Sequence, residues 1–239
     1  MSTASRIVLA TPHARYDALE SALRSQHGFE VLRIRERDAL EATAIAAFSP
    51  SHVFFPHWSW KIPASVFERF ECVIFHMTDL PFGRGGSPLQ NLVVRGIEAT
   101  QLTALQCVAE LDAGPIYLKR PLSTLGTAEE VFLRAAALME PMIMDIVRRQ
   151  LKPMPQSGEP VSFKRRTPAE GNLAAAADLA RVHDMVRMLD AEGYPRAFVD
   201  VGRFRFEFSR ASRRHDHVLA DVHITLLPAD QDPAEKDTR

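Results

Sequence analysis

The sequence predicts an α/β domain with a mostly parallel central sheet, followed by a smaller α+β subdomain. Short apolar strands alternate with helical segments through the first half of the chain, which is typical of a parallel sheet covered by helices. Prolines and a glycine then gather between Lys152 and Pro160, and this density predicts a linker. We therefore expect a main domain over residues 1–151, a linker over 152–160, a C-terminal subdomain over 161–228 and a flexible tail over 229–239.

The elements of the main domain follow from apolar periodicity and from helix-ending residues. Gly28 predicts the end of the first helix, and Ser87-Pro88 predicts an N-cap followed by proline at the first helical position. We expect strands over residues 7–10, 31–34, 53–55 and 73–75, and helices over residues 16–28, 38–48 and 87–96.

The second half of the main domain begins with a hairpin. Residues 101–111 and 115–122 are strand-like around Asp112-Ala113-Gly114. Thr127 and Glu130 form a capping-box signature for a helix that runs to about residue 150. We expect Pro141 to kink or split this helix.

The C-terminal subdomain combines one helix with late strands. Apolar residues recur on one face of the segment 174–189. Phe204, Phe206 and Phe208 alternate with charged residues, the pattern of a half-buried strand. That strand serves either an interface with a second copy, in a homodimer, or packing on its own helix.

Composition excludes several classes of protein. The 239 residues are 46% apolar and carry 29 basic against 30 acidic side chains, a formal net charge of −1. A dedicated nucleic-acid binder usually has a basic excess, and no stretch approaches the length of a membrane span. Cys72 and Cys107 form no metal-binding or disulfide pattern. The cysteine pattern therefore predicts no metal. We expect a soluble cytoplasmic protein, since the N-terminus shows no signal-peptide layout.

The first strand-to-helix turn, Ala10-Thr11-Pro12-His13, lacks the glycines of a dinucleotide site. A more informative loop runs from His76 through Gly83-Arg84-Gly85-Gly86. Ligands of open α/β sheets bind beyond the carboxyl ends of strands, which is where His76 is expected. A catalytic role for His76 therefore stands beside a purely structural one.

Three motifs, taken in order, resemble one known family. His-x-x-x-Leu-Pro-x-x-Arg-Gly begins at His76, and Leu-Asp-x-Gly-x-Ile occupies residues 111–116. The third comprises residues 187–190 and 194–198. Together they resemble the folate-dependent formyltransferases, which include methionyl-tRNA, glycinamide-ribonucleotide and nucleotide-sugar enzymes. The resemblance covers most of residues 5–208. It implies a Rossmann-like formyltransferase fold, a catalytic domain over 1–151, and N10-formyltetrahydrofolate as the formyl donor.

The resemblance also implies roles for two residues. His76 would stabilise the oxyanion of a tetrahedral intermediate, and Asp112 would orient the imidazole and accept a proton. The alternative for Asp112 alone is a turn aspartate beside glycine. The family usually has Asn-x-His, but Ile74 occupies the asparagine position here. Either His57 or Asn91 replaces the missing donor, with Asn91 more easily explained as a surface residue, or the chain is a non-catalytic folate-binding relative.

A second loop, His57-Trp58-Ser59-Trp60-Lys61-Ile62, resembles the family segment that holds the pterin. Two tryptophans can form an apolar slot for a flat heterocycle, or they can pack in the core. By the same resemblance, Val108 and Leu111 would border the pterin.

The acceptor is inferred from the resemblance, from size and from charge. The loop residues assigned to acceptor binding are Asp79, Phe82, Gly83, Arg84 and Gly85. Two basic clusters follow the linker, Lys164-Arg165-Arg166 and the group of Arg203, Arg205, Arg210, Arg213 and Arg214. They form a solvated face, or else Arg84 or residues 164–166 contact a diphosphate of the substrate. We expect a nucleotide-linked amino sugar as acceptor, with methionyl-tRNA as the alternative.

Overall fold

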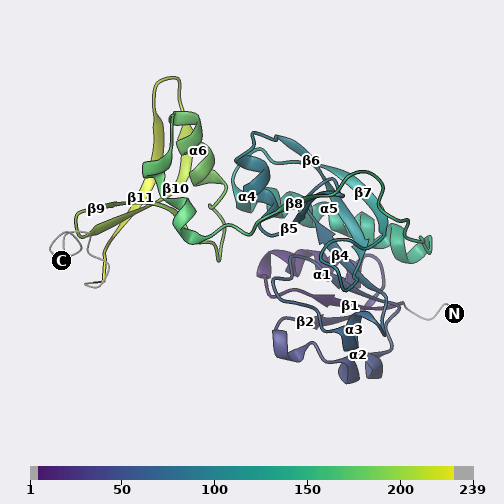
Figure 1. The fold of residues 1–239 in the computed structure, drawn as a ribbon. Coiled ribbons are helices and arrows are strands. Elements are labelled where there is room, and N and C mark those ends of the chain that lie inside the picture. The colour runs from purple at the N-terminus through teal and green to yellow at the C-terminus, as the bar shows by residue number, and fades with distance from the viewer. Residues whose placement is uncertain (1–4, 229–239) are drawn as a thin grey trace. The chain divides into compact units, whose positions relative to one another are not determined.

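The computed structural model describes residues 5–228, which form two compact units (Figure 1). The first comprises the described residues up to Pro88 together with Ala99–Ser123 and Phe132–Phe163. The second comprises Leu89–Glu98, Thr124–Val131 and the described residues from Lys164 onward. The segment predicted as a linker thus belongs to the first unit, and the predicted tail over 229–239 lies outside the described residues.

A six-stranded sheet organises the first unit, in the order β2-β1-β3-β4-β6-β7. The first four strands in this order are parallel, and β6 and β7 are antiparallel to their neighbours. This confirms the predicted α/β class with a mostly parallel sheet. The strands are β1 (Arg6–Ala10), β2 (Glu30–Ile34), β3 (His52–Phe55), β4 (Cys72–His76), β6 (Ala99–Gln106) and β7 (Ile116–Ser123).

The strands form because their apolar runs are buried on both faces of the sheet. Ile7, Leu9, Val53 and Phe54 have no exposed surface, as expected for central parallel strands. The helical elements along the sheet are η1 (Ala14–Tyr16), α1 (Asp17–Ser25), η2 (Arg37–Ala39), α2 (Ala42–Phe48), α3 (Ala64–Phe67) and α5 (Ala128–Arg148).

Helix α5 continues through Pro141, so of the two predicted effects, a kink or a split, the split is wrong. A proline removes one backbone hydrogen bond from a helix interior. Met139, Met142 and Ile143 are buried around it, and burial of an amphipathic face stabilises a helix more than intrinsic propensity does.

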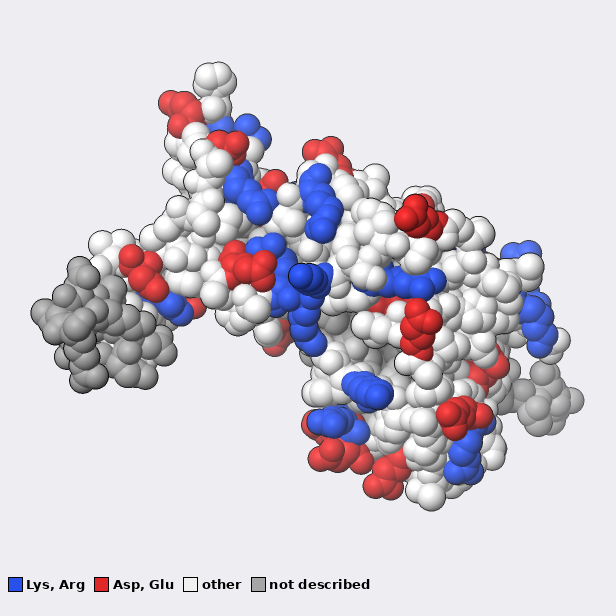
Figure 2. Space-filling view, viewed as in Figure 1, with Lys and Arg blue, Asp and Glu red and all other residues white. Residues whose placement is uncertain are grey.

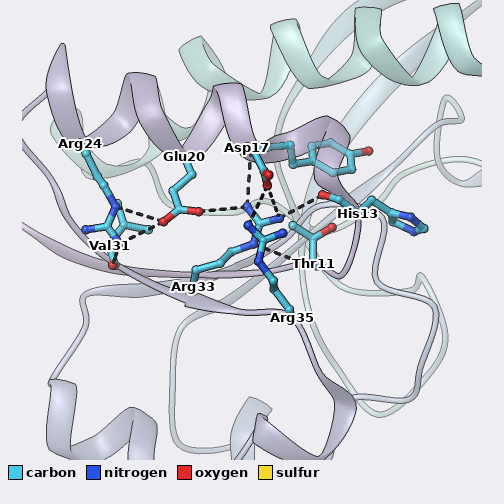
Figure 3. A network of polar contacts seen from close by, with 9 residues as sticks. Thr11, His13, Asp17, Glu20, Arg24, Val31, Arg33 and Arg35 are labelled. Atoms are coloured by element: carbon cyan, nitrogen blue, oxygen red, sulfur yellow. Dashed lines mark hydrogen bonds and ion pairs between the residues drawn. The ribbon is translucent and has the colours of Figure 1, made fainter.

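Arg33 on β2 fixes the turn that follows β1 (Figure 3). Its guanidinium forms ion pairs with Asp17 at 3.3 Å and Glu20 at 3.4 Å. It also donates to the backbone carbonyls of Thr11 at 3.1 Å and His13 at 3.0 Å. Burial, with Arg35 nearby, lowers the pKa of Arg33. This network holds the chain where it leaves the carboxyl end of β1.

The two strands of the predicted hairpin are joined by a longer loop than expected. Strand β6 ends at Gln106 and β7 begins at Ile116, so the predicted strand over 101–111 is wrong in its last residues. The chain leaves the sheet after Cys107, whose amide donates to Cys72 O at 2.8 Å. Residues 109–111 are exposed, and only Asp112 and Gly114 of the connection beyond Cys107 are buried. The connection is a loop that holds most of the second sequence motif, residues 111–116, outside the strands.

A second, two-stranded sheet lies beside this loop. Strand β5 (Phe82–Gly85) pairs in parallel with β8 (Val161–Phe163). The glycine-rich turn predicted after His76 is therefore a short strand, and its partner comes from beyond the predicted linker. A side chain at position 85 would place its Cβ 2.4 Å from Phe163 O, so this strand pairing requires a glycine at that position.

The second unit is a small α+β subdomain, as predicted. It contains most of α4 (Pro88–Val93), with α6 (Leu179–Arg187) and a three-stranded sheet in the order β11-β10-β9. Its helix begins later than predicted because Asp178 caps it, accepting from Arg181 N at 2.8 Å. The remaining elements are η3 (Pro168–Gly171), η4 (Leu173–Ala175), β9 (Ala197–Val201), β10 (Phe204–Arg213) and β11 (Val218–Leu226).

The predicted Phe204–Phe208 alternation lies on β10. Direct cross-strand partners on the same face include Leu226 for Phe204 and Ile224 for Phe206, so this face is apolar. Phe206 and Phe208 are half-buried, whereas Ile224 and Leu226 are exposed. A homodimer through this strand stays a prediction.

Candidate functional site

The site begins at the carboxyl end of β4, where the strand delivers His76. The imidazole is buried, and its Nε2 donates to the carbonyl of Gly83 at 2.8 Å. Thr78 Oγ1 donates to the same carbonyl at 3.3 Å and Thr103 Oγ1 donates to Thr78 O at 2.7 Å. The loop after β4 is thereby folded back over the histidine.

Asp112 faces the other imidazole nitrogen. Its Oδ2 lies 3.6 Å from His76 Nδ1 and accepts from the amide of Gly85 at 2.9 Å. Both side chains of the pair are less than one-tenth exposed. Asp112 has a φ of +52°, a left-handed conformation that aspartate and asparagine tolerate better than most residues. The structure therefore brings together the histidine and the aspartate that the sequence motifs singled out.

Gly114 allows the Asp112 loop to return against the sheet. A Cβ at this position would lie 1.8 Å from the carbonyl oxygen of Gln106, so the requirement for glycine is one of close approach. The glycine of the Leu-Asp-x-Gly-x-Ile pattern thus has a direct steric cause.

Gln156, which is not among the predicted site residues, joins the two loops of the site. Its amide nitrogen donates to the carbonyls of Asp112 at 2.7 Å and Gly114 at 2.8 Å. Its amide oxygen accepts from Arg84 Nη2 at 2.8 Å and Nε at 3.1 Å. No periodicity or motif marks this residue, because its partners lie more than forty residues away along the chain.

The arrangement can exchange protons and stabilise negative charge. The two imidazole nitrogens of His76 face a carbonyl oxygen and a carboxylate. An imidazolium can donate from both nitrogens, whereas a neutral imidazole donates from one. The carboxylate of Asp112 is positioned to interact with that charge, and the Gly85 amide fixes one of its oxygens. The two side chains, held by backbone groups, have the chemistry that acid–base catalysis requires.

The two replacements proposed for the missing asparagine have contacts with residues other than His76. The ring of His57 lies 4.5 Å from those of His13 and Phe132. Burial, with His13 and Arg15 nearby, lowers the pKa of His57 to about 3. Since the neutral ring is strongly favoured, His57 is no cation at neutral pH.

Asn91 is a buried residue of α4, so its interpretation as a surface residue is wrong. Its amide nitrogen donates to Lys164 O at 2.9 Å, and its Oδ1 accepts from Arg95 at 2.9 Å. Helix position alone predicted exposure, whereas these contacts within the second unit bury the side chain. Ile74, at the usual asparagine position, is half-buried in the core cluster that also contains Phe55.

The residues expected to hold a pterin have mixed surroundings. Trp58 and Trp60 meet edge to face at 4.8 Å, and Trp58 packs against Phe55. Trp58 also lies in the same core cluster as Ile74 and the buried Ile62, so packing accounts for part of its environment. Ser59 and Lys61 are exposed and Val108 is half-buried. Leu111, next to Asp112, exposes 68% of its surface.

The residues expected to bind the acceptor have partners within the protein. Asp79 forms an ion pair with Lys119 at 2.5 Å, and Phe82 meets Phe163 edge to face. Arg84 is bonded to Gln156 and lies 3.3 Å from Glu110. Gly83 and Gly85 offer the carbonyl and the amide already described.

Several arginines of the predicted basic clusters are paired with acids. Arg205 pairs with Asp200 at 2.8 Å, Arg166 with Glu170 at 3.3 Å, and Arg210 with Asp221. Among residues 5–228, no group of histidine, cysteine and carboxylate side chains could hold a metal ion. No helix in the described part of the chain has the length and apolarity needed to cross a membrane.

Comparison with known proteins shows relatives over nearly the whole chain. A structure titled "Methionyl-tRNA formyltransferase from Clostridium thermocellum" superimposes with a TM-score of 0.89 and 42% identity, covering 93% of this chain and 99% of that one. A family model described as "Methionyl-tRNA formyltransferase, C-terminal domain" matches residues 168–225.

Curated relatives are longer than the matched region. The methionyl-tRNA formyltransferase of Thermobifida fusca is 32% identical over half of this chain, and the alignment covers 41% of that protein. The enzyme of the same name from Gluconobacter oxydans is 27% identical, and its alignment covers 93% of this chain and 69% of the relative. The fold is also that of a structure from Mycobacterium tuberculosis titled as a likely sugar N-formyltransferase, with a TM-score of 0.65, 17% identity and coverage of 95% and 99%.

Proposed function

Because this chain belongs to the formyltransferase family, we propose that it transfers a formyl group from N10-formyltetrahydrofolate to a primary amine. The observation that supports this most directly is the buried pair of His76 and Asp112, with Nδ1 and Oδ2 3.6 Å apart at the carboxyl end of β4. This is the edge of an α/β sheet where ligands bind.

The residues around the pair suit a flat, partly apolar donor. Leu111 presents 68% of its surface directly beside the buried Asp112, and apolar walls with a few polar groups are typical of small-molecule sites. The donor supplies an activated formyl carbon. Trp58, Ser59, Trp60, Lys61, Ile62 and Val108 stay proposed neighbours of the donor.

The proposed roles follow from the partners of the two ring nitrogens of His76. The attacking amine must be neutral and loses a proton as it bonds to the formyl carbon, while negative charge develops on the formyl oxygen. The bond between the formyl carbon and N10 of the donor then breaks, and N10 takes up a proton as tetrahydrofolate leaves. His76 stabilises that charge as a hydrogen-bond donor or cation, and this requires it to exchange its bond to Gly83 O for one to the substrate. Asp112 sets the charge of the imidazole and accepts the amine proton, directly or through water.

For the acceptor we propose a nucleotide-linked amino sugar. The near balance of 29 basic and 30 acidic residues supports a small acceptor over a nucleic acid. On the face drawn in Figure 2, basic and acidic side chains are both scattered among a larger area of uncharged residues. Asp79, Phe82, Gly83, Arg84 and Gly85 remain the proposed acceptor loop.

Methionyl-tRNA is the second candidate, and the names of the relatives favour it. The Clostridium thermocellum protein carries that name and is matched over 99% of its chain, so size does not separate the two acceptors. A tRNA acceptor predicts binding that weakens steeply as salt rises, whereas a nucleotide sugar makes few phosphate contacts.

The test incubates the protein with N10-formyltetrahydrofolate and either UDP-, GDP- and dTDP-amino sugars or methionyl-tRNA, and detects the added formyl mass. We expect a formylated amino sugar. Formylation of methionyl-tRNA alone would replace the sugar by the second candidate. No product with any amine would leave a folate-binding protein without turnover, consistent with Ile74.

The roles of the pair are tested by two substitutions with matched controls. His76→Ala and Asp112→Asn should each lower kcat by about 10²-fold or more. His215→Ala and Asp38→Asn change exposed residues of the same types and should leave kcat unchanged. A rate like that of the unmodified protein in either site variant removes that residue from the mechanism.

A further inference from the structure

Gln156 occupies a segment that the sequence marks only as a linker, yet it makes four hydrogen bonds at the site. Both partners of its amide nitrogen are carbonyl oxygens, which only accept. Both partners of its amide oxygen are guanidinium nitrogens, which only donate. The amide therefore has a single orientation that satisfies every contact.

The partners belong to the two loops that form the candidate site. The carbonyls are those of Asp112, which carries the carboxylate, and of Gly114, two residues further along the same turn. The guanidinium is that of Arg84, next to the Gly85 amide that binds the same carboxylate at 2.9 Å. One side chain thus connects the backbone of Asp112 with the strand that holds its oxygen.

The turn needs such support because its backbone is unusual. Asp112 has a left-handed φ of +52°, and residues 109–111 just before it are exposed. A non-glycine residue in this region is held there by its surroundings. Two hydrogen bonds from Gln156 reach this loop from the segment after α5.

We propose that Gln156 is a positioning residue, which holds the Asp112 turn and Arg84 in one geometry so that the carboxylate faces His76. This inference rests on the proposed function for its catalytic consequence. The same bonds orient the guanidinium of Arg84, which also contacts Glu110, within the proposed acceptor loop.

Two nearly isosteric substitutions separate the halves of this role. Gln156→Glu keeps an acceptor for Arg84 but cannot donate to the two carbonyls when ionised, whereas Gln156→Met loses both sets of bonds. Each lost bond is worth about a few-fold to tenfold, so we expect both variants to lower kcat about 10- to 100-fold. The KM for the donor should change less, because five of the proposed neighbours of the donor, residues 58–62, lie outside this loop.

A second readout is independent of turnover. The Gly85 amide donates to Asp112 Oδ2, and hydrogen exchange at this amide reports whether the carboxylate stays in place. We expect faster exchange in both Gln156 variants and no change in Ser157→Ala, which alters the exposed neighbouring residue. If Gln156→Met fails to fold, Gln156→Glu and Arg84→Met carry the test.

The outcomes distinguish this inference from the proposed function. Wild-type kcat and wild-type Gly85 exchange in Gln156→Glu and Gln156→Met would overturn the positioning role while formyl transfer stands. Normal kinetics in Gln156→Glu alone would also overturn it, because the role would then reduce to holding Arg84. If the unmodified protein transfers no formyl group, the proposed function fails, and Gly85 exchange still decides whether Gln156 holds the turn.

Discussion

Replacing Gly114 by alanine tests whether the close return of the Asp112 loop controls the site. The new Cβ would lie 1.8 Å from Gln106 O and 2.9 Å from Gln106 C. Neither atom can yield like the end of a flexible side chain, because Gln106 is paired in β6 and its amide donates to Pro115 O at 2.8 Å. The loop must therefore move.

The size of the effect follows from that distance. Real Cβ atoms essentially never approach closer than 3.0 Å, so the loop must shift by roughly 1 Å, and such a misplacement of a catalytic group costs about 10²-fold in rate. Forcing a methyl group into a packed site costs about 1–3 kcal/mol of stability. We expect Gly114→Ala to lower kcat by about 10²-fold and the free energy of unfolding by about 1–3 kcal/mol.

Urea denaturation followed by the fluorescence of Trp58 and Trp60 gives the free energy of unfolding, and the formyl-transfer assay gives kcat. Gly28→Ala is the control, because Gly28 has a φ of +71° but nothing within 4 Å of an added Cβ. It should lose about 1 kcal/mol and no activity. A Gly114→Ala protein with unchanged kcat would refute the reasoning that this contact positions Asp112.

Three further predictions concern buried groups. The pKa of His57 is lowered to about 3, so between about pH 3 and 6.5 the unfolded chain binds a proton that the folded chain does not. The free energy of unfolding should therefore fall as the pH drops below about 6.5, by up to about 1.4 kcal/mol per pH unit. NMR titration should show His57 unprotonated at pH 5, and a midpoint near 6.5 would contradict this. Burial raises the pKa of Cys107 to about 11 and raises that of Cys72 as well, so a thiol reagent at pH 8 should label both only in urea, and fast labelling of the folded protein would refute their burial. Arg187 is buried and donates to Thr124 O at 2.7 Å and Gly126 O at 3.0 Å, so Arg187→Met should lower the free energy of unfolding by about 2–3 kcal/mol. Arg203→Met, which changes an exposed arginine, should alter the free energy of unfolding little. Equal stability of the two variants would contradict the prediction.

The sequence predicted the parts of the molecule that depend on local patterns. The apolar runs over 7–10 and 53–55 became central strands, because continuous burial selects such runs. The same patterns placed His76 at the end of its strand. The Leu-Asp-x-Gly-x-Ile motif led to Asp112, which the structure brings within 3.6 Å of that histidine.

What the sequence missed depends on contacts between distant segments. Nothing near Gln156 announces that its partners are Asp112 and Arg84. Strand β8 has three residues and acquires its strand conformation by pairing with β5. Periodicity cannot predict such pairing, because a short strand carries too few residues to show a pattern.

The parallel pairing of β5 with β8 has a consequence for the order of folding. It joins residues 82 and 161, and Gln156 joins its own loop to Asp112. Contacts between such distant segments form slowly, because the intervening chain must be closed into a loop. During synthesis, strands β1–β4 can assemble long before the chain reaches Gln156. We therefore expect His76 and Asp112 to reach their final arrangement after the first strands of the sheet have assembled.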